Sequence, residues 1–263
     1  NLAPETSKTL TMGAVFSPSW LRGVSVSVDW YDIKVNGAIG TLSSNDILQA
    51  CFDGDSSLCS LIVRDPTTNE VERVHRNYLN LNQLHVNGID VEAAYSTSIK
   101  VFGGGNERLS TRLFLSWLGE NSITLATGAK TDYVGQVGYA AGAGGNARSL
   151  PEWKATANVT YSNGPFSLTL QERFIGSGFQ NPNPIPGITD IDRNKVSAIL
   201  YSDIRMSYQF MDGRFELNGS VTNLTDTAPP STPSGNLILL APYNTALYDV
   251  LGRRFVVGAK VRF

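Results

Sequence analysis

The chain has 263 residues, with 21 Lys and Arg against 23 Asp and Glu, which gives a formal net charge of −2. A nucleic-acid-binding domain usually carries a clear basic excess, so this balance argues against that class. No apolar stretch approaches the roughly 20 residues that a membrane-spanning helix needs. Hydrophobic residues make up 41% of the chain, with 11 Phe, 10 Tyr and 4 Trp, which excludes a disordered composition.

Apolar and polar residues alternate with a period of two along most of the chain. The alternation is strict over residues 24–30, 153–161, 204–210 and 215–221. Alternation of this length indicates strands with one apolar and one polar face. We predict nine strands, at residues 7–17, 23–38, 78–97, 107–119, 149–162, 165–176, 199–211, 213–226 and 247–263.

The connections between these strands alternate strictly between short and long. The short ones lie at 18–22, 103–106, 163–164 and 212–213, and the last two are Asn-Gly and Asp-Gly pairs that suit tight hairpins. The long ones cover about 39–77, 120–148, 177–198 and 227–246. All tight turns therefore fall at one end of the sheet and all long loops at the other. This asymmetry is typical of transmembrane β-barrels, so we expect an all-β chain that forms a transmembrane antiparallel β-barrel segment.

The last predicted strand shows the two faces that a barrel in lipid requires. One face carries Phe255, Val257, Ala259, Val261 and Phe263, and the other carries Arg254, Gly258, Lys260 and Arg262. Arg253 interrupts the apolar row where the apolar band should end. The alternation slips near residues 31–33 and 86–88, and we predict a β-bulge at each place. The pattern alone leaves open a soluble barrel whose apolar face points inward.

An odd number of hairpin-connected strands has a structural consequence. Nine strands place the first and the last in the same direction, whereas bacterial single-chain barrels are normally antiparallel with even counts. Closure would fail, and two unsatisfied sheet edges would remain in lipid. We therefore expect these residues to form part of a larger barrel, completed by another portion of the protein or by another chain.

Five stretches in order resemble the C-terminal part of the TonB-dependent outer-membrane receptors. They are Asn-Leu-Ala-Pro-Glu-Thr-Ser at 1–7 followed by Gly13, Asp-Trp-Tyr-Asp-Ile-Lys-Val at 29–35, Asn-Gly-Ile-Asp-Val-Glu at 87–92, Val-Thr-Asn-Leu-Thr-Asp at 221–226, and Leu-Gly-Arg-Arg at 251–254 with the terminal Phe263. Each motif is weak by itself, but together they extend over essentially the whole chain.

The resemblance implies a 22-stranded barrel filled by an N-terminal plug, with residues 1–263 as the C-terminal portion that supplies the last nine strands. It implies a receptor in the outer membrane of a Gram-negative bacterium that takes up a scarce solute such as a ferric siderophore or an oligosaccharide. The implied partners are the rest of the barrel and the plug, the TonB–ExbB–ExbD complex, outer-membrane lipid and the extracellular solute. The alternatives are a passive porin-like or structural barrel and a soluble β-sandwich binding module.

Cys51 and Cys59 are the only cysteines, and both lie in the first long loop. We expect them to form a disulfide, because an outward-facing loop lies in an oxidising environment. A metal site that combines them with His75 or His85 lacks the usual ligand spacing. Residues 43–50 read as a capped short helix that leads into Cys51. No motif points to an enzyme, a resident metal or a cofactor.

Charged residues on the predicted inner face include a basic set: Arg108, Arg112, Lys154, Arg173, Arg205, Arg254, Lys260 and Arg262. Two interpretations are open, a wet lumen that hydrogen-bonds a plug and a guide for an anionic solute. Aromatic residues near the predicted strand ends suggest two interfacial girdles; they are Trp20, Trp30, Trp117, Trp153, Tyr161 and Phe210.

Contacts to the solute are expected on the long loops and at the outer end of the inner wall. The candidates are polar or aromatic residues predicted at that end: Arg64, Arg73, His75, Tyr133, Arg148, Gln180, Asn181, Asn183 and Tyr243.

Overall fold

The computed structural model describes residues 2–80, 83–102, 106–125, 128–138, 149–184, 187, 191–232 and 243–262. No helix among these residues combines the length and the apolar character that crossing a membrane would demand. Strands dominate, and the two helices are short.

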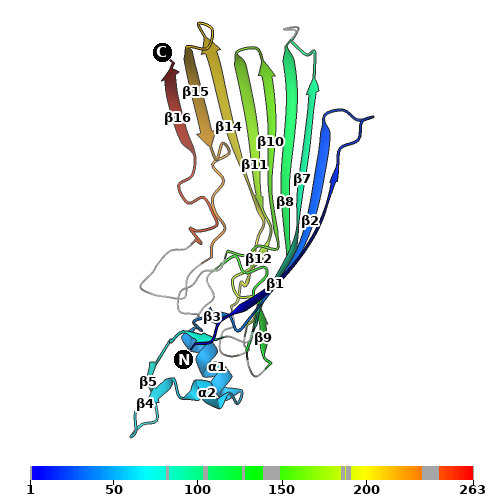
Figure 1. The fold of residues 1–263 in the computed structure, drawn as a ribbon. Helices are drawn as coiled ribbons and strands as arrows, with labels where there is room; N and C mark the ends of the chain where they lie inside the picture. The colour runs from blue at the N-terminus through cyan, green and yellow to red at the C-terminus, as the bar shows by residue number, and fades with distance from the viewer. Residues whose placement is uncertain are drawn as a thin grey trace.

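One large antiparallel sheet forms a wall, and its nine long strands lie side by side in sequence order (Figure 1). These strands are β1 (Thr6–Phe16), β2 (Val24–Asn36), β7 (Gln83–Ser98), β8 (Glu107–Thr124), β10 (Trp153–Asn163), β11 (Phe166–Ile175), β14 (Ile199–Phe210), β15 (Phe215–Thr222) and β16 (Arg254–Val261). The short turns lie at the top of the view and the long connections at the bottom, where the two helices also lie. All nine predicted strands and the two-ended arrangement are thus confirmed.

The largest differences from the predicted strand limits occur beside the long loops. The predicted third strand began at 78 but β7 begins at Gln83, and the predicted last strand began at 247 but β16 begins at Arg254. Residues 247–253 instead form hydrogen-bonded loop structure, in which the backbone N–H of Arg253 donates to Asp226 Oδ1. Arg253 therefore precedes the strand, which explains why it interrupts the apolar row.

Both outermost strands of the wall have one unpaired edge. Among the described residues β1 pairs only with β2, and β16 pairs only with β15. The free edge of β1 is 11 residues long and that of β16 is 8 residues long. Edges of this length template pairing with further strands.

The two faces of the wall follow from the register. Asp29, Asp90, Ser116 and Lys154 are consecutive partners across β2, β7, β8 and β10, so their side chains share one face. They line an open hollow of about 570 Å³, to which five neighbouring strands contribute. Ala246 and Leu247 of the last long loop also line this hollow, so it lies on the side of the wall over which that loop folds. We call this side the inner face and the opposite side the outer face.

The outer face carries the apolar residues. On β14 and β15, which both have neighbours on either side, Met206, Tyr208 and Leu217 point outward and are 50–57% exposed. Large apolar side chains on strands with neighbours on both sides would be buried in a soluble barrel core. Their exposure supports the membrane-facing interpretation of the alternation over the inward-facing one.

Three of the predicted girdle tryptophans share one row of the outer face. Trp30 is the partner of Ile89, Ile89 of Trp117, and Trp117 of Trp153. The rings of Trp117 and Trp153 lie 6.2 Å apart between centroids. This row lies toward the long loops, as an interfacial aromatic belt would.

One of the two predicted β-bulges is present and the other is wrong. The pairing of β7 with β8 shifts between Asn87 and Gly88, whose partners are Glu120 and Leu118. Gly119 is therefore the extra residue, and the bulge lies on β8 opposite the predicted position. By contrast, β2 pairs residue for residue with both neighbours over its whole length, so no bulge exists at residues 31–33.

The break in the apolar–polar alternation at residues 31–33 has a different cause. On β2 the apolar side chains occupy the outer face up to Trp30 and the inner face at Ile33 and Val35. On β7, Val86 and Leu84 likewise turn inward. The backbone alternation continues undisturbed, and it is the apolar face that changes sides near the loop end.

A compact loop unit packs against these inward-facing apolar residues. It contains β3 (Ile39–Gly40), α1 (Ser44–Phe52), α2 (Ser56–Cys59), β4 (Ile62–Arg64), β5 (Val71–Val74) and β6 (Leu79–Asn80). Its buried centre consists of Ala38, Leu42, Ile47, Ala50 and Leu58. Val35, Leu84 and Ile123 of the wall pack against that centre, so the first long loop has its own hydrophobic core and is fastened to the wall.

The predicted short helix is confirmed as α1. Ser43 caps its N-terminus by accepting a hydrogen bond from the backbone N–H of Asp46, while Asp46 accepts one in return from the N–H of Ser43. This reciprocal capping box satisfies two N–H groups at the helix start.

A second buried cluster joins the other long loops. It contains Val137, Ile175, Val196, Ile199, Tyr201 and Tyr248. The short strands β12 (Gly178–Phe179) and β13 (Lys195–Val196) lie beside it, and the backbone N–H of Val137 donates to the carbonyl of Phe179. The short strand β9 (Lys130–Asp132) extends the end of β8. Asn244 is fully buried and donates to the carbonyl of Val137, which is 107 residues away in sequence. The last three long loops thus pack into one body at the loop end of the wall.

Candidate solute-facing surface

Charged groups of both signs line the hollow on the inner face. Asp29 and Asp90 are directly paired across β2 and β7, with Glu92 next along β7. Lys154 and Arg173 line the same hollow from β10 and β11. Like charges directly opposite each other disfavour the sheet, so the nearby cations offset an unfavourable pair.

Most of the basic residues predicted on the inner wall have partners within the wall. The Nε atom of Arg112 lies 2.7 Å from Glu92 Oε1, and Arg262 lies 3.7 Å from Glu216. Arg205 donates to Gln171 at 3.2 Å, and Arg108 donates to Ser96 at 2.6 Å. These cations are therefore held by neighbouring side chains of the wall, acidic ones for Arg112 and Arg262, which favours the wet-lumen interpretation over a basic guide for anions.

One ion-pair network joins the wall to the last long loop. Arg173 donates to Asp203 at 2.8 and 3.1 Å, a two-pronged contact. Asp249 of the loop lies 3.9 Å from Arg173 and 3.1 Å from Arg254, and its side chain is only 6% exposed. The neighbouring Tyr248 is buried in the second cluster, and this burial raises the pKa of its phenol to about 12.

Two of the sequence motifs meet at the base of this loop. Asn223 is fully buried with a positive φ of 53°, and its side chain both donates to and accepts from the backbone of Thr227. Asp226 pairs with Arg253 at 3.7 Å and accepts the backbone N–H of the same residue. A Cβ on Gly252 would lie 2.9 Å from the Asp226 carboxylate. The motifs at 221–226 and 251–254 therefore close the ends of the last long loop.

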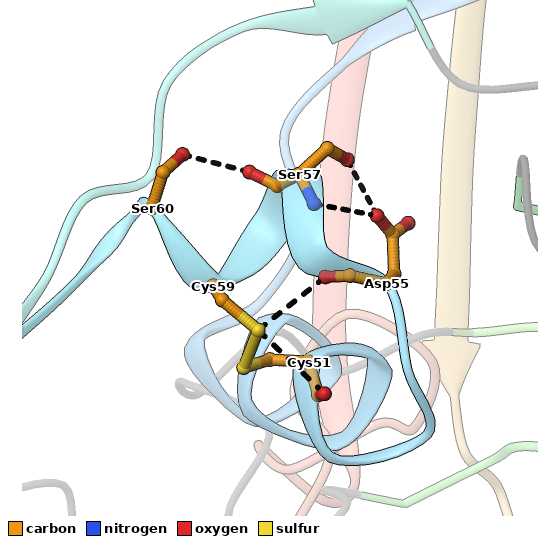
Figure 2. Close-up of a disulfide and its surroundings, with 5 residues drawn as sticks. All are labelled: Cys51, Asp55, Ser57, Cys59 and Ser60. Carbon is orange, nitrogen blue, oxygen red and sulfur yellow. Dashed lines mark hydrogen bonds between the residues drawn. A yellow bond between two sulfur atoms is a disulfide. The ribbon is translucent and has the colours of Figure 1, made fainter.

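Cys51 and Cys59 form a disulfide at the end of α1 and α2 (Figure 2). Their sulfur atoms lie 2.08 Å apart and their Cα atoms 4.9 Å apart. Asp55 caps α2 between them by accepting from the backbone N–H of Ser57 at 3.1 Å. The disulfide staples the outer part of the loop unit.

Three of the predicted solute contacts lie on this loop unit, away from the other candidates. Arg64 belongs to β4 and donates to the carbonyl of Asn69 at 2.9 Å across the hairpin. Arg73 lies on β5, and His75 follows it; both are exposed. The turn between β4 and β5 is organised by Asp65, whose pKa is lowered by hydrogen bonds from the backbone N–H groups of Thr68 and Thr67.

Gln180, Asn181 and Asn183 lie together on the loop that contains β12, and they hold that loop in shape. The side chain of Gln180 is buried and donates to the carbonyl of Arg193 at 2.8 Å. Asn181 exchanges two hydrogen bonds with the side chain of Asn194. Asn183 donates to the carbonyl of Asp132, which brings it beside the segment that contains Tyr133.

The remaining predicted solute contacts are Tyr133, Tyr243 and Arg148. Tyr133 is half-buried, and its backbone N–H donates to Asn121 at 3.0 Å. Tyr243 is half-buried next to the buried Asn244. Arg148 lies outside the described residues. The structure thus gathers Tyr133, Gln180, Asn181, Asn183 and Tyr243 on the loop body, and it separates them from Arg64, Arg73 and His75.

A second hollow of about 570 Å³ lies within the loop body, where no residue except Gln180 was predicted from the sequence. Arg193, Lys195, Ser197, Thr227 and Ser231 provide its polar lining. The only sequence signal for it is the basic pair at positions 193 and 195, in a stretch otherwise read as loop. No group of three His, Cys, Asp or Glu residues within the described part of the chain is arranged to hold a metal ion.

Comparison with known proteins identifies the family. The family model described as "TonB dependent receptor-like, beta-barrel" matches residues 1–224. The chain therefore belongs to the TonB-dependent receptor family, in its β-barrel region, as the motifs indicated. No curated protein sequence matches the chain.

Solved structures similar to this chain in fold include two siderophore receptors and an iron transporter. The ferric enterobactin receptor of Pseudomonas aeruginosa is 12% identical, with a TM-score of 0.59 over 98% of this chain. The siderophore receptor PirA of Acinetobacter baumannii is 15% identical with a TM-score of 0.57 over 100%, and the FrpB iron transporter of Neisseria meningitidis is 12% identical with a TM-score of 0.56 over 97%. The chain spans 31%, 32% and 31% of these proteins respectively, about a third of each.

Proposed function

We propose that residues 1–263 are the C-terminal portion of the β-barrel of an outer-membrane receptor that takes up a scarce solute with energy delivered through TonB. In this proposal the nine wall strands are the last nine of a 22-stranded barrel. The earlier strands and the plug domain complete it, and the TonB–ExbB–ExbD complex energises it. The protein acts as a transport receptor in the outer membrane of a Gram-negative bacterium and has no catalytic role.

The observation that carries this proposal is the division of the wall into two unlike faces. Exposed apolar residues such as Met206 and Leu217 occupy the outer face, while paired charges such as Arg173 and Asp203 occupy the inner face. An apolar outer face can contact lipid, and a charged inner face suits a wet lumen that holds a plug. Family membership and the fold of the related barrels agree with this orientation.

The unpaired edges of β1 and β16 support the larger barrel. An open strand edge cannot remain unsatisfied in the hydrocarbon of a membrane. Pairing with further strands on both sides removes each edge, and the similar structures exceed this chain about threefold in length.

For the solute, we propose only a chemical class. Structures with this fold include proteins described as ferric enterobactin and siderophore receptors and as a copper transporter. At 11–15% identity this likeness extends to the fold alone. A ferric siderophore, an oligosaccharide or a similar large nutrient all fit a receptor of this kind.

The experiment that tests the proposal is uptake in matched strains. Strains with and without the gene, each with and without TonB, are grown on a panel of ferric siderophores as the only iron source and oligosaccharides as the only carbon source. Saturable growth that needs both the gene and TonB supports the receptor. Growth that needs the gene but not TonB would indicate the porin-like alternative, and recovery of the protein in the soluble fraction would contradict both.

A further inference from the structure

The hollow in the loop body differs from the hollow on the inner wall in its charge. It lies between the loop that precedes β14 and the loop that follows β15. Its polar lining includes Arg193 and Lys195 together with Ser197, Thr227 and Ser231. Its apolar lining consists of Val196, Ala198, Ile199, Ala228 and Pro230. Its volume of about 570 Å³ is within the range of pockets that bind small molecules.

The cations of this hollow are not neutralised. Within the part of the chain that the structure describes, neither Arg193 nor Lys195 forms an ion pair, and no lining residue is acidic. On the inner wall, by contrast, Arg112, Arg173 and Arg254 all have carboxylate partners. The loop hollow is therefore a local positive region, and three hydroxyl side chains beside it can donate further hydrogen bonds to an anion.

The segment that carries the two cations is fixed in place before any ligand arrives. The carbonyl of Arg193 accepts from the Gln180 side chain at 2.8 Å, and the carbonyl of Asn194 accepts from the Gln180 backbone at 2.8 Å. Lys195 then pairs with Phe179 in the β12–β13 ladder. These bonds fix the backbone from which the Arg193 and Lys195 side chains extend, so binding does not have to order the segment itself.

We propose that this hollow binds an anionic group of the extracellular solute, with Arg193 and Lys195 as the charge partners. The apolar lining suits a solute whose carboxylate, sulfonate or phenolate groups are attached to an apolar ring or chain. The assignment to the transported solute rests on the proposed function, but the binding of anions does not. Gln180 and Asn181 act here as positioning residues for the cationic segment.

Direct binding to the purified full-length protein in detergent tests this proposal. The probe is pyrenetetrasulfonate, an anionic ring compound whose fluorescence anisotropy reports binding. Removing both charges by Arg193→Gln with Lys195→Gln is expected to weaken probe binding at least about tenfold, the value of one charge-assisted contact. The charge-matched control is Arg22→Gln with Lys100→Gln, which removes two exposed cations beside the short turns, at the opposite end of the wall from the hollow, and should change affinity less than about threefold.

A second variant tests the hollow without touching the cations. Ala198→Glu introduces a carboxylate into its lining and is expected to weaken the probe to a similar degree. Equal losses in the Arg193/Lys195 and Arg22/Lys100 variants would overturn the proposal, because the attraction of the anionic probe would then be general to the protein's cations. Absence of probe binding to the unchanged protein would also overturn it, whereas TonB-independent uptake with intact probe binding would overturn only the proposed transport function.

Discussion

The orientation of the wall can be tested by placing the same charge on its two faces. Met206 and Ser207 are neighbours on β14, and the register directs Met206 outward and Ser207 inward. We predict that Met206→Arg destabilises the assembled barrel strongly and that Ser207→Arg does so only weakly. The two variants introduce the same charge at nearly the same distance along β14 and differ only in the face of the wall that carries it.

The magnitude follows from the depth of Met206. It lies four residues before Phe210, where β14 ends at a short turn. With about 3.4 Å per residue and a tilt near 40°, four residues correspond to a height of roughly 10 Å within an apolar band about 25 Å tall. Arg near the midplane of such a band costs about 2–4 kcal/mol, whereas a new cation beside the wet inner face costs far less.

The assay is the folding equilibrium of the full-length protein in lipid vesicles, measured over a urea series by the gel shift between folded and unfolded forms. The expected result is a loss of about 2–4 kcal/mol for Met206→Arg and less than about 1 kcal/mol for Ser207→Arg. If Ser207→Arg costs as much as Met206→Arg or more, the assignment of the two faces is wrong, and with it the membrane orientation.

Three further predictions test local features. Replacing both cysteines of the disulfide by Ser should remove about 2–3 kcal/mol from the local stability of the loop unit; hydrogen exchange should rise in α1 but not in the wall strands. Gly88→Ala should cost roughly 1–3 kcal/mol, because its Cβ would lie 2.5 Å from the Trp117 carbonyl oxygen, while Gly219→Ala, with no neighbour closer than 3.7 Å, should fold normally. Burial raises the pKa of the Tyr248 phenol to about 12, whereas an exposed tyrosine titrates at about 10. Between these two values the phenol ionises only when the last long loop is displaced, so the docking of that loop on the second cluster should weaken as pH rises from about 10 to 12. A step in tyrosinate absorbance near pH 10 that is absent in Tyr248→Phe would contradict this.

The sequence was sufficient to predict the strands because each wall strand has one wet and one apolar face over most of its length. Periodicity identifies such a strand locally, as it does for residues 204–210 of β14. The turns at Gly164 and Gly213 could be placed for a similar reason, since both adopt a positive φ that Gly allows. These features need no knowledge of the rest of the chain.

The prediction failed where two causes produce one pattern. At residues 31–33 a bulge and a change of apolar face give the same break in alternation. Deciding between them requires knowing that Val35 packs against Ile47 and its neighbours in the loop unit. That contact is tertiary, so no local pattern could reveal it.

The contacts around the candidate site could not be predicted from the sequence, because they depend on which residues the fold pairs. The sequence gives the inner-face parity of Arg173, but only the register shows that Asp203 lies within reach on β14. That Asn181 contacts the solute stays a prediction; the structure adds that its backbone exchanges two hydrogen bonds with the side chain of Asn194, thirteen residues away. Polar loop residues are as often structural as functional, and composition cannot separate the two roles.

If the wall spans the membrane as proposed, the change of apolar face on β2 and β7 marks where it leaves the apolar band. Beyond the tryptophan row the outer face turns polar: His85 lies between Asp32 at 2.7 Å and Glu120 at 2.9 Å, and Lys34 and Lys130 flank the two acids at 3.6 and 2.6 Å. Such a cluster is costly against hydrocarbon and stable in water or among headgroups. The strands therefore extend past the apolar band, and the loop unit covers the inner side of that extension. Because its core includes wall residues, the unit is built onto the barrel rim, and movement of the loop unit alone would expose its own core.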